Sequence, residues 1–385
     1  MNLLRHLFFT FFSLLLVGCG YQYQLSKGKL KAVSEQEIIP FHFEKDMIFL
    51  EVFVNGKKKR FILDSGAPNV IDDDLQKEFN FKEVYSTNFK DASNRSSKLV
   101  MVKIDKISFG AIEVKNTVAA VADFSQFSCY NIDGIIGTNI MSFFDWKIDY
   151  EQELATLYKS GIPADSLDSF GISIPFFSNL QKSPFFKLHL GNITFNKVEV
   201  DLGSNGGINL QKWNQFDLEN YKEKYQIFGE TSVGIHGPIL DTTLVVEVDN
   251  VSFGDYPIPK TLITVKPTST SKVGNRFLKN YDLLLSWSRE AIYLKQNTPL
   301  EYDRDNEILY LGWKEGQLYV KAFTQDLSEL VESGDRIIEL DGKNTNQISE
   351  IDYCEIKSGN LKNIRLKIEK FRGHETIELL VDKVL

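Results

Sequence analysis

The carboxylate of Asp64 occupies an unusual place in the sequence. It directly follows the apolar residues 61–63, and it precedes a hydroxyl at Ser65 and a glycine at Gly66. An acid at the end of a buried strand can act as a general acid or base when it is positioned against a substrate. Asp, Ser and Gly are also common in tight turns, so this stretch alone fits either a turn or a catalytic loop.

The chain contains a second copy of this stretch. Residues 53–72 and 190–209 both run as strand, polar turn and strand, followed by Asp-x-Gly, which aligns Asp64 with Asp201 (201 − 64 = 137). Two further pairs of segments match in the same order, namely 105–121 with 249–265 and 135–159 with 272–295. Three ordered matches at nearly equal offsets indicate an internal duplication, which supplies a second acid.

The repeated unit spans about 130 residues, which is too long for a solenoid repeat and indicates a duplicated lobe. Alternating apolar and polar segments, separated by Gly and Asn turns, predict strands in both copies. Residues 72–81 predict one short helix that begins with a capping Asp. The predicted fold class is mainly β, with two homologous β-barrel lobes in tandem followed by a smaller α+β domain. The expected boundaries are a signal at 1–19, a tether at 20–35, lobe one at 36–160, lobe two at 161–299 and a C-terminal unit at 305–385.

The segments around the two acids resemble the active-site motifs of aspartic proteases. Asp64-Ser65-Gly66-Ala67 is similar to the retropepsin version, residues 133–137 (DGIIG) are similar to the segment that packs behind the catalytic loop, and the two-lobed chain is similar to pepsin. The resemblance covers roughly residues 36–298. It implies acid-protease-like barrels, with Asp64 and Asp201 as catalytic residues at the lobe interface. It also implies supporting roles for Ser65, Gly66, Gly203, Ser204, Ile135, Ile136 and Gly137.

The chemistry of such a pair follows from electrostatics. Two carboxylates about 3 Å apart cannot both ionise cheaply, so they share one proton and titrate together. One acid then serves as the base for a bound water, and the other donates a proton to the substrate carbonyl. A glycine after each acid lets the backbone approach closely. The resemblance implies that Ser65 hydrogen-bonds across to the opposite lobe and that Ser204 hydrogen-bonds the outer oxygen of Asp201.

Lobe two departs from this pattern at two places. Leu202 stands where lobe one has Ser65, so it has no hydroxyl for a reciprocal bond between the lobes. Residues 272–274 (Lys-Val-Gly) replace the more apolar 135–137. Hairpins expected to close over the cleft are centred on 91–98 and 233–238.

The C-terminal unit resembles a bacterial PDZ domain in residues 309–313 (LYLGW) and 334–344 (GDRIIELDGKN). The resemblance implies that a loop containing Leu311, Gly312 and Trp313 receives the carboxylate of a C-terminal peptide, which adds as a strand. A domain retained only for docking or packing is the alternative.

The N-terminus carries an export pattern. Arg5 and His6 precede an apolar run too short to span a bilayer as a helix, and the segment closes as residues 16–19 (LVGC). This resembles the lipobox of bacterial lipoproteins, which implies lipidation at Cys19 and a membrane-anchored protein facing the periplasm or the cell exterior. An ordinary signal with an incidental Cys, or an uncleaved anchor, remains open.

Composition excludes several function classes. The net charge of −8 argues against a nucleic-acid partner, and 29 Phe and 15 Tyr argue against disorder. The His residues lack metal-ligand spacing, so we expect neither a metal site nor a cofactor. Cys129 and Cys354 are expected as free, partly buried thiols, although an exported protein can pair them.

Three hypotheses follow. The first is a membrane-tethered aspartic endopeptidase that uses Asp64 and Asp201, acts on polypeptides and recruits them through the PDZ-like unit. The second is an inactive lipoprotein that binds peptides in the cleft. The third is a retropepsin-like homodimer in which only lobe one is catalytic.

Overall fold

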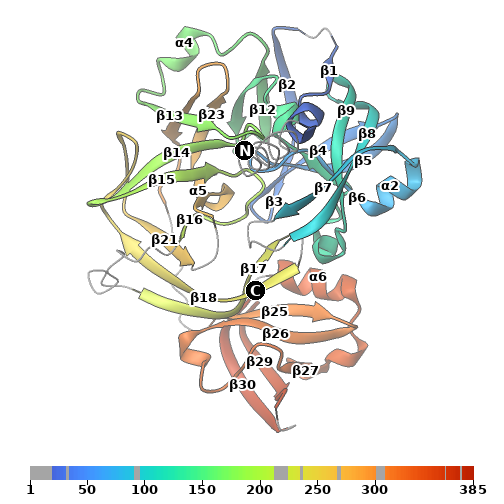
Figure 1. Cartoon of the computed structure of the whole chain (residues 1–385). Helices are drawn as coiled ribbons and strands as arrows, with labels where there is room; N and C mark the ends of the chain where they lie inside the picture. The colour runs from blue at the N-terminus through green and yellow to red at the C-terminus, as the bar shows by residue number, and fades with distance from the viewer. Residues whose placement is uncertain are drawn as a thin grey trace, which may run out of the picture.

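Strands dominate the architecture, as predicted. The computed structural model describes residues 20–31, 34–90, 96–211, 224–234, 237–266, 270–300, 308–359, 361–372 and 375–385. Lobe one and lobe two lie side by side, and the C-terminal unit lies below them in the view of Figure 1. The mainly β fold class is therefore confirmed.

Lobe one contains strands β1 to β12. Its elements are β1 (Lys29–Leu30), β2 (Gln36–Pro40), β3 (His42–Glu44), β4 (Met47–Val54), β5 (Lys57–Leu63), β6 (Val70–Asp72), α2 (Asp73–Phe79), β7 (Lys82–Lys90), β8 (Ser96–Phe109), β9 (Ile112–Ala122), the 3-10 helix η1 (Ser125–Tyr130), β10 (Gly134–Ile136), α3 (Thr138–Met141), β11 (Asp145–Asp149) and β12 (Leu154–Tyr158). Helix α2 falls within the predicted segment 72–81, and Asp72 is its N-cap residue, although its side chain makes no capping hydrogen bond.

The described part of lobe two repeats this order with fewer helices. Its elements are α4 (Ala164–Leu167), β13 (Ser173–Ser178), β14 (Pro184–Leu190), β15 (Ile193–Val200), β16 (Ile208–Gln211), β17 (Lys224–Gly234), β18 (Gly237–Val248), β19 (Val251–Phe253), β20 (Tyr256–Ile258), β21 (Thr261–Lys266), β22 (Lys272–Val273), α5 (Asn275–Leu278), β23 (Tyr281–Ser286) and β24 (Ala291–Gln296).

The C-terminal unit is a small mixed structure with its own apolar core. Its elements are β25 (Ile308–Lys314), β26 (Gln317–Thr324), η3 (Gln325–Leu327), β27 (Arg336–Leu340), β28 (Lys343–Asn344), η4 (Thr345–Gln347), α6 (Glu350–Ser358), β29 (Leu361–Glu369) and β30 (Thr376–Val384).

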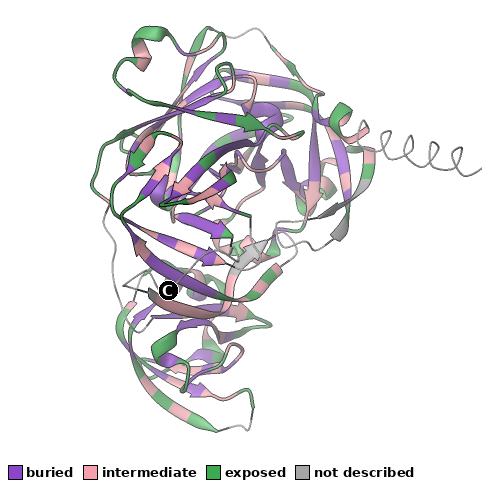
Figure 2. Ribbon diagram, turned by 60° about the vertical axis from the view of Figure 1, so that its left-hand side comes forward, coloured by how far each residue is buried: buried purple, intermediate pink, exposed green. Residues whose placement is uncertain are grey.

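A central antiparallel sheet joins the two lobes. Its strand order is β2-β12-β11-β23-β24-β13, so lobe one contributes three strands and lobe two contributes the equivalent three. The two lobes meet where β11 pairs with β23, with Trp146 opposite Leu285. One apolar cluster extends from one lobe into the other, and its buried residues are among those coloured purple in Figure 2. The shared core fixes the lobes relative to each other, which is necessary if two acids are to meet between them.

Part of the expected tether packs on lobe one. Residues 20–25 are helical, Leu25 is buried against Met101 and Val118, and β1 pairs with β9. At least this part of segment 20–35 therefore belongs to the lobe instead of extending away from it.

The C-terminal unit is attached to both lobes. Strand β26 pairs antiparallel with β17 of lobe two, and the hydroxyl of Tyr319 donates to Glu230 Oε2 (2.9 Å). On the other side, Cys129 of η1 forms a disulfide with Cys354 of α6. The expectation of free thiols was therefore wrong, because the fold brings together two segments that lie 225 residues apart.

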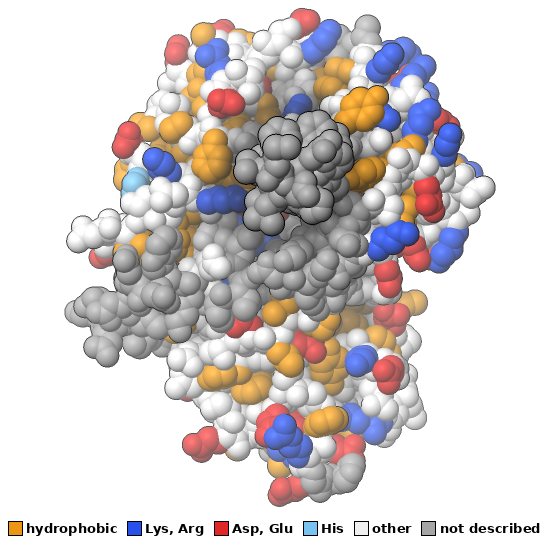
Figure 3. Space-filling view, viewed as in Figure 1, with side chains coloured by type: hydrophobic (Ala, Val, Ile, Leu, Met, Phe, Trp, Pro, Cys, Tyr) orange, Lys and Arg blue, Asp and Glu red, His pale blue; other side chains and the backbone are white. Residues whose placement is uncertain are grey.

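Charged side chains of both signs are interspersed over the face shown in Figure 3. Among the described residues, no helix is both long and apolar enough to cross a membrane.

Candidate active site

The two acids end equivalent strands. Asp64 follows β5 and Asp201 follows β15, and each strand pairs in parallel with a short strand, β10 or β22 respectively. The Asp64 N–H donates to Ile136 O and the Asp201 N–H donates to Val273 O, both at 3.0 Å. The duplication read from the sequence therefore recurs as the same backbone hydrogen bond in each lobe.

The glycine that follows each short strand is required by packing. A Cβ on Gly137 would lie 2.2 Å from the carbonyl carbon of Pro68, and one on Gly274 would lie 2.6 Å from Ser204 O. No larger residue fits at either place without displacing the backbone that carries the acid. Residues 135–137 therefore pack against the loop of Asp64, and residues 272–274 pack in the same way in lobe two, while the supporting role of Ile135, Ile136 and Gly137 stays a prediction.

The two loops interlock where the acids meet. A Cβ on Gly203 would lie 2.3 Å from Asp64 Cγ, and a Cβ on Gly66 would lie 3.3 Å from Asp201 Cγ. The backbone after each acid therefore packs on the opposite carboxyl group. Asp64 and Asp201, which lie 137 residues apart in the sequence (201 − 64), are thereby brought to one place.

The hydrogen bonds to the two carboxyl groups are not the same. Asp64 Oδ1 accepts from the N–H groups of Gly66 (2.6 Å) and Ala67 (3.1 Å). Asp201 Oδ1 accepts from the Gly203 N–H (3.0 Å), while its Oδ2 accepts from Lys272 Nζ (2.8 Å). Only Asp201 therefore has an ammonium group as a hydrogen-bond partner.

Electrostatics make Asp64 a weak acid. Burial, followed by repulsion from Asp201, raises the pKa of Asp64 to about 7, while the N–H donors and the more distant Lys272 oppose the rise. Below that pH the group carries a proton that it can donate, as the acid of a catalytic pair must.

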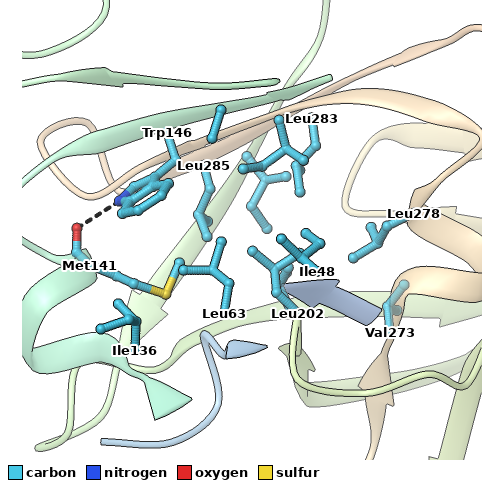
Figure 4. Close-up of a cluster of buried hydrophobic side chains, with 14 of the residues drawn as sticks. Ile48, Leu63, Ile136, Met141, Trp146, Leu202, Val273, Leu278, Leu283 and Leu285 are labelled. Atoms are coloured by element: carbon cyan, nitrogen blue, oxygen red, sulfur yellow. Dashed lines mark hydrogen bonds between the residues drawn. The ribbon is translucent and has the colours of Figure 1, made fainter. Parts of the chain in front are cut away.

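Ser65 makes the predicted bond between the lobes. Its hydroxyl donates to Val200 O (2.6 Å) and accepts from the Leu202 N–H (3.0 Å). Leu202 has no hydroxyl for a reciprocal hydrogen bond. Its side chain is instead fully buried in the shared apolar core, near Leu63 and Ile48 in Figure 4. Packing takes the place of the second hydrogen bond.

The role expected of Ser204 is filled by another residue. The Ser204 hydroxyl accepts from the Gly206 N–H (3.4 Å), and Lys272 Nζ donates to the outer oxygen of Asp201 (2.8 Å). A long basic side chain on β22 reaches that oxygen, a possibility that the motif alone did not suggest.

Two charged residues in this site were missed as functional candidates. Glu199 and Lys272 are opposite each other in the β15–β22 register. Glu199 lies two residues before Asp201 and therefore shares its strand face. The signal was present in the duplication, because the offset of 137 aligns them with Ile62 and Ile135 of lobe one (199 − 62 and 272 − 135).

The remaining predicted sites lie elsewhere. Leu311, Gly312 and Trp313 form part of strand β25 and not a loop, and the Leu311 N–H already donates to Leu385 O (2.8 Å). The Trp313 ring stacks on Tyr353 of α6. Cys19 and the hairpin residues 91–95 and 235–236 lie outside the described residues.

One group of acids in the described part of the chain is close enough to hold a metal ion. It comprises Asp72, Asp73 and Asp74 at the start of α2. Lys77 forms ion pairs with Asp73 (3.1 Å) and Asp74 (2.8 Å), so this cluster already has a cation and belongs to the helix rather than to the Asp64–Asp201 site.

Comparisons with known proteins agree with this geometry. Residues 50–140 match the model of the aspartyl protease family. The matched segment includes Asp64 and the supporting segment 135–137. A search of curated proteins found no match.

Two solved structures are similar in part. A retropepsin-like aspartic protease from Rickettsia conorii is 18% identical, covering 34% of this chain and 93% of that chain, with a TM-score of 0.25. Basic 7S globulin from soybean is 10% identical, covering 69% of this chain and 96% of that chain, with a TM-score of 0.39.

Proposed function

We propose that this protein is an aspartic endopeptidase that hydrolyses peptide bonds with a water activated between Asp64 and Asp201. The observation that supports it is the interlock of the two loops, in which Gly203 packs on the Asp64 carboxyl group and Gly66 packs beside that of Asp201. This arrangement brings one protonated and one ionised acid to a common substrate.

Each acid accepts one proton and donates one proton during the reaction. The ionised acid removes a proton from water as the water oxygen bonds to the peptide carbonyl carbon, and the protonated acid donates its proton to the carbonyl oxygen. In the second step the C–N bond breaks. The first acid then gives its acquired proton to the leaving nitrogen, and the second recovers a proton from the gem-diol hydroxyl.

Substitution of either acid tests this proposal. Asp64→Asn and Asp201→Asn should each abolish cleavage of an unfolded protein, followed by mass spectrometry from pH 4 to 8. Asp105→Asn is the matched control, because the Asp105 side chain is 73% exposed and distant from the site in sequence. A wild type that cleaves nothing across a broad peptide library would refute the proposal, as would an Asp64→Asn variant with full activity.

The Lys272–Asp201 ion pair favours a second candidate, a peptide-binding protein without catalysis. Lys272 Nζ lies 2.8 Å from Asp201 Oδ2. In this candidate the ion pair prevents Asp201 from acting as a catalytic acid or base. Peptide binding in the cleft without cleavage, measured by fluorescence anisotropy and mass spectrometry on one sample, would support it. The homodimer hypothesis differs from both, because it alone expects Asp201→Asn to remain active.

The proposal extends to recruitment and location. The C-terminal unit is proposed to hold polypeptide ends, so full-length protein should bind peptides with a free C-terminal carboxylate more tightly than their amidated forms. Equal affinity for the two forms would contradict it.

Lipidation at Cys19 is proposed to anchor the protein to a membrane. Metabolic palmitate labelling should then be lost in Cys19→Ser, and retained label would contradict the anchor.

A further inference from the structure

We infer that Lys272, assisted by Glu199, decides which acid of the pair holds the proton, so that Asp201 is the base and Asp64 is the acid. This inference rests on the proposed endopeptidase function. It assigns separate roles to two acids that the duplication alone would leave equivalent.

The first support is a comparison of the two lobes. In lobe one the register pair on β5 and β10 is Ile62 opposite Ile135, and both are buried in an apolar cluster beside the loop of Asp64. In lobe two the same register pair on β15 and β22 is Glu199 opposite Lys272. An apolar pair on one side of the site thus corresponds to a pair of opposite charges on the other. Both members of the pair differ between the lobes, and the two new side chains have opposite charges. This is the pattern expected of a functional pair, because an unpaired buried charge is costly.

The second support is the reach of the ammonium group. Lys272 Nζ lies 2.8 Å from Asp201 Oδ2, where the Asp201 side chain is only 9% exposed. Asp64, by contrast, accepts hydrogen bonds from the backbone N–H groups of Gly66 and Ala67. A cation in contact with one carboxyl group favours the ionised form of that group over its neighbour. The proton shared by the pair is therefore directed to Asp64.

Glu199 is the third carboxyl group of this arrangement. Its carboxyl carbon lies 3.2 Å from where a Cβ of Gly66 would be, so it belongs to the same cluster. Burial, and then repulsion from Asp201, raise the pKa of Glu199 well above its ordinary value. Ser183 hydrogen-bonds to Glu199 and its hydroxyl donates to Gly66 O (3.2 Å). The raised pKa favours the protonated form of Glu199, which leaves Asp201 as the ionised partner of Lys272.

The other charged groups around Lys272 do not change the assignment. From β21, Lys266 faces it, and burial followed by repulsion from Lys272 lowers the pKa of Lys266 to about 8. For Lys272 itself, burial lowers the pKa, but attraction to Asp201 and the hydrogen bond to it, with smaller contributions from Glu199 and Asp64 when these are ionised, raise it above its ordinary value. Lys272 therefore remains a cation throughout the pH range in which the acids exchange protons.

The consequence is a fixed direction of proton transfer. Asp201 takes the proton of the attacking water, and Asp64 protonates the carbonyl oxygen. In the breakdown step Asp64 recovers a proton from the gem-diol, and Asp201 passes its own to the amine. All bonds and protons balance without a further reactant.

The test compares pH profiles of kcat/KM for the full-length wild type, Lys272→Met and Lys272→Arg. An adjacent opposite charge typically moves a carboxyl titration by about 1–3 pH units. The acid limb of Lys272→Met should therefore shift upward by at least about one unit, equivalent to about tenfold lower kcat/KM at a pH on that limb. Lys272→Arg should keep the wild-type limb. Lys187→Met, at an exposed position on β14, is the control for loss of a positive charge.

A double variant controls for a folding defect in Lys272→Met. Glu199→Ile with Lys272→Ile rebuilds the apolar pair of lobe one, and it should show the same upward shift as Lys272→Met. A limb that coincides with that of the wild type in both variants would overturn the inference, as would a Lys272→Met variant that cleaves while the wild type does not.

A second readout needs no activity. In protein with ¹³C-labelled Asp carboxyl groups, infrared difference spectra against Asp201→Asn isolate the Asp201 band. The pH at which its ionised band disappears should be higher in the double variant than in the wild type, and identical midpoints would overturn the inference. If no form of the protein cleaves peptides, the proposed function fails, and this comparison still decides which acid holds the proton.

Discussion

Gly203→Ala is the most direct test of the interlocked site. A methyl group there would lie 2.3 Å from both Asp64 Cγ and Asp64 Oδ2. Cβ contacts below 3.0 Å are essentially never seen, so the carboxyl group or the loop must move by at least 0.7 Å (3.0 − 2.3). The backbone of Gly203 is not left-handed, so alanine is otherwise acceptable there. The effect therefore reports the contact with Asp64 alone.

The expected loss follows from that displacement. A misplacement of about 1 Å at a reacting group can cost about a hundredfold in rate, which corresponds to about 2.7 kcal/mol of transition-state stabilisation. Overpacking a close contact also costs about 1–3 kcal/mol of stability. We expect kcat/KM for a fluorogenic peptide to fall about a hundredfold or more, with a measurable decrease in the unfolding midpoint in denaturant.

Gly207→Ala is the matched control. Gly207 lies in the same loop, has no positive φ, and an added Cβ would meet nothing within 4 Å. This variant should keep wild-type kcat/KM within about threefold. Near-normal activity in Gly203→Ala would refute the reasoning, because it would mean that the two loops do not interlock around Asp64 as described.

Three further predictions concern pH, the bond between the lobes and the disulfide. Because Asp64 must be protonated to act as the acid and its pKa is raised to about 7, kcat/KM should fall about tenfold per pH unit above about 7, and activity that rises up to pH 9 would contradict this assignment. Ser65→Ala leaves a buried carbonyl and a buried N–H of lobe two unpaired, so denaturant unfolding should show a loss of about 1–3 kcal/mol, whereas an unchanged midpoint would argue against the contact. Cys129→Ser, Cys354→Ser and the double variant should each lose the same stability, about 2–5 kcal/mol, because all three remove one bond; additive losses in the double variant would count against the disulfide.

The sequence was sufficient for the parts of the site that the duplication repeats. The alignment of Asp64 with Asp201 and of Gly137 with Gly274 predicted equivalent positions, and the structure gives them equivalent hydrogen bonds. These are local features of a strand, a tight loop and a glycine, and each has a short sequence pattern. The hydroxyl at Ser65 could be assigned a partner in the opposite lobe for the same reason.

The parts that failed depend on distances between segments that the sequence does not reveal. Cys129 and Cys354 are paired because the C-terminal unit docks on lobe one, and no spacing rule predicts a bond across that distance. Residues 311–313 were predicted to form a loop, whereas they belong to strand β25, in which Leu311 and Gly312 are buried. From the sequence, Lys272 only makes residues 272–274 less apolar than 135–137. Its contact with Asp201 could not be predicted, because that contact requires the parallel pairing of β15 and β22.

The three departures of lobe two, at positions 199, 202 and 272, all surround Asp201. In an assembly of two identical lobes, each residue near one acid has an identical copy near the other acid. A cation placed there would therefore favour the ionised form of both acids equally. A single chain with two lobes removes this constraint, because one copy can change alone. Leu202 keeps the loop packed without a second hydroxyl, while Glu199 and Lys272 replace an apolar pair that lobe one retains. The duplication therefore permits what a symmetric dimer cannot, which is one acid adapted to accept a proton and the other adapted to donate it.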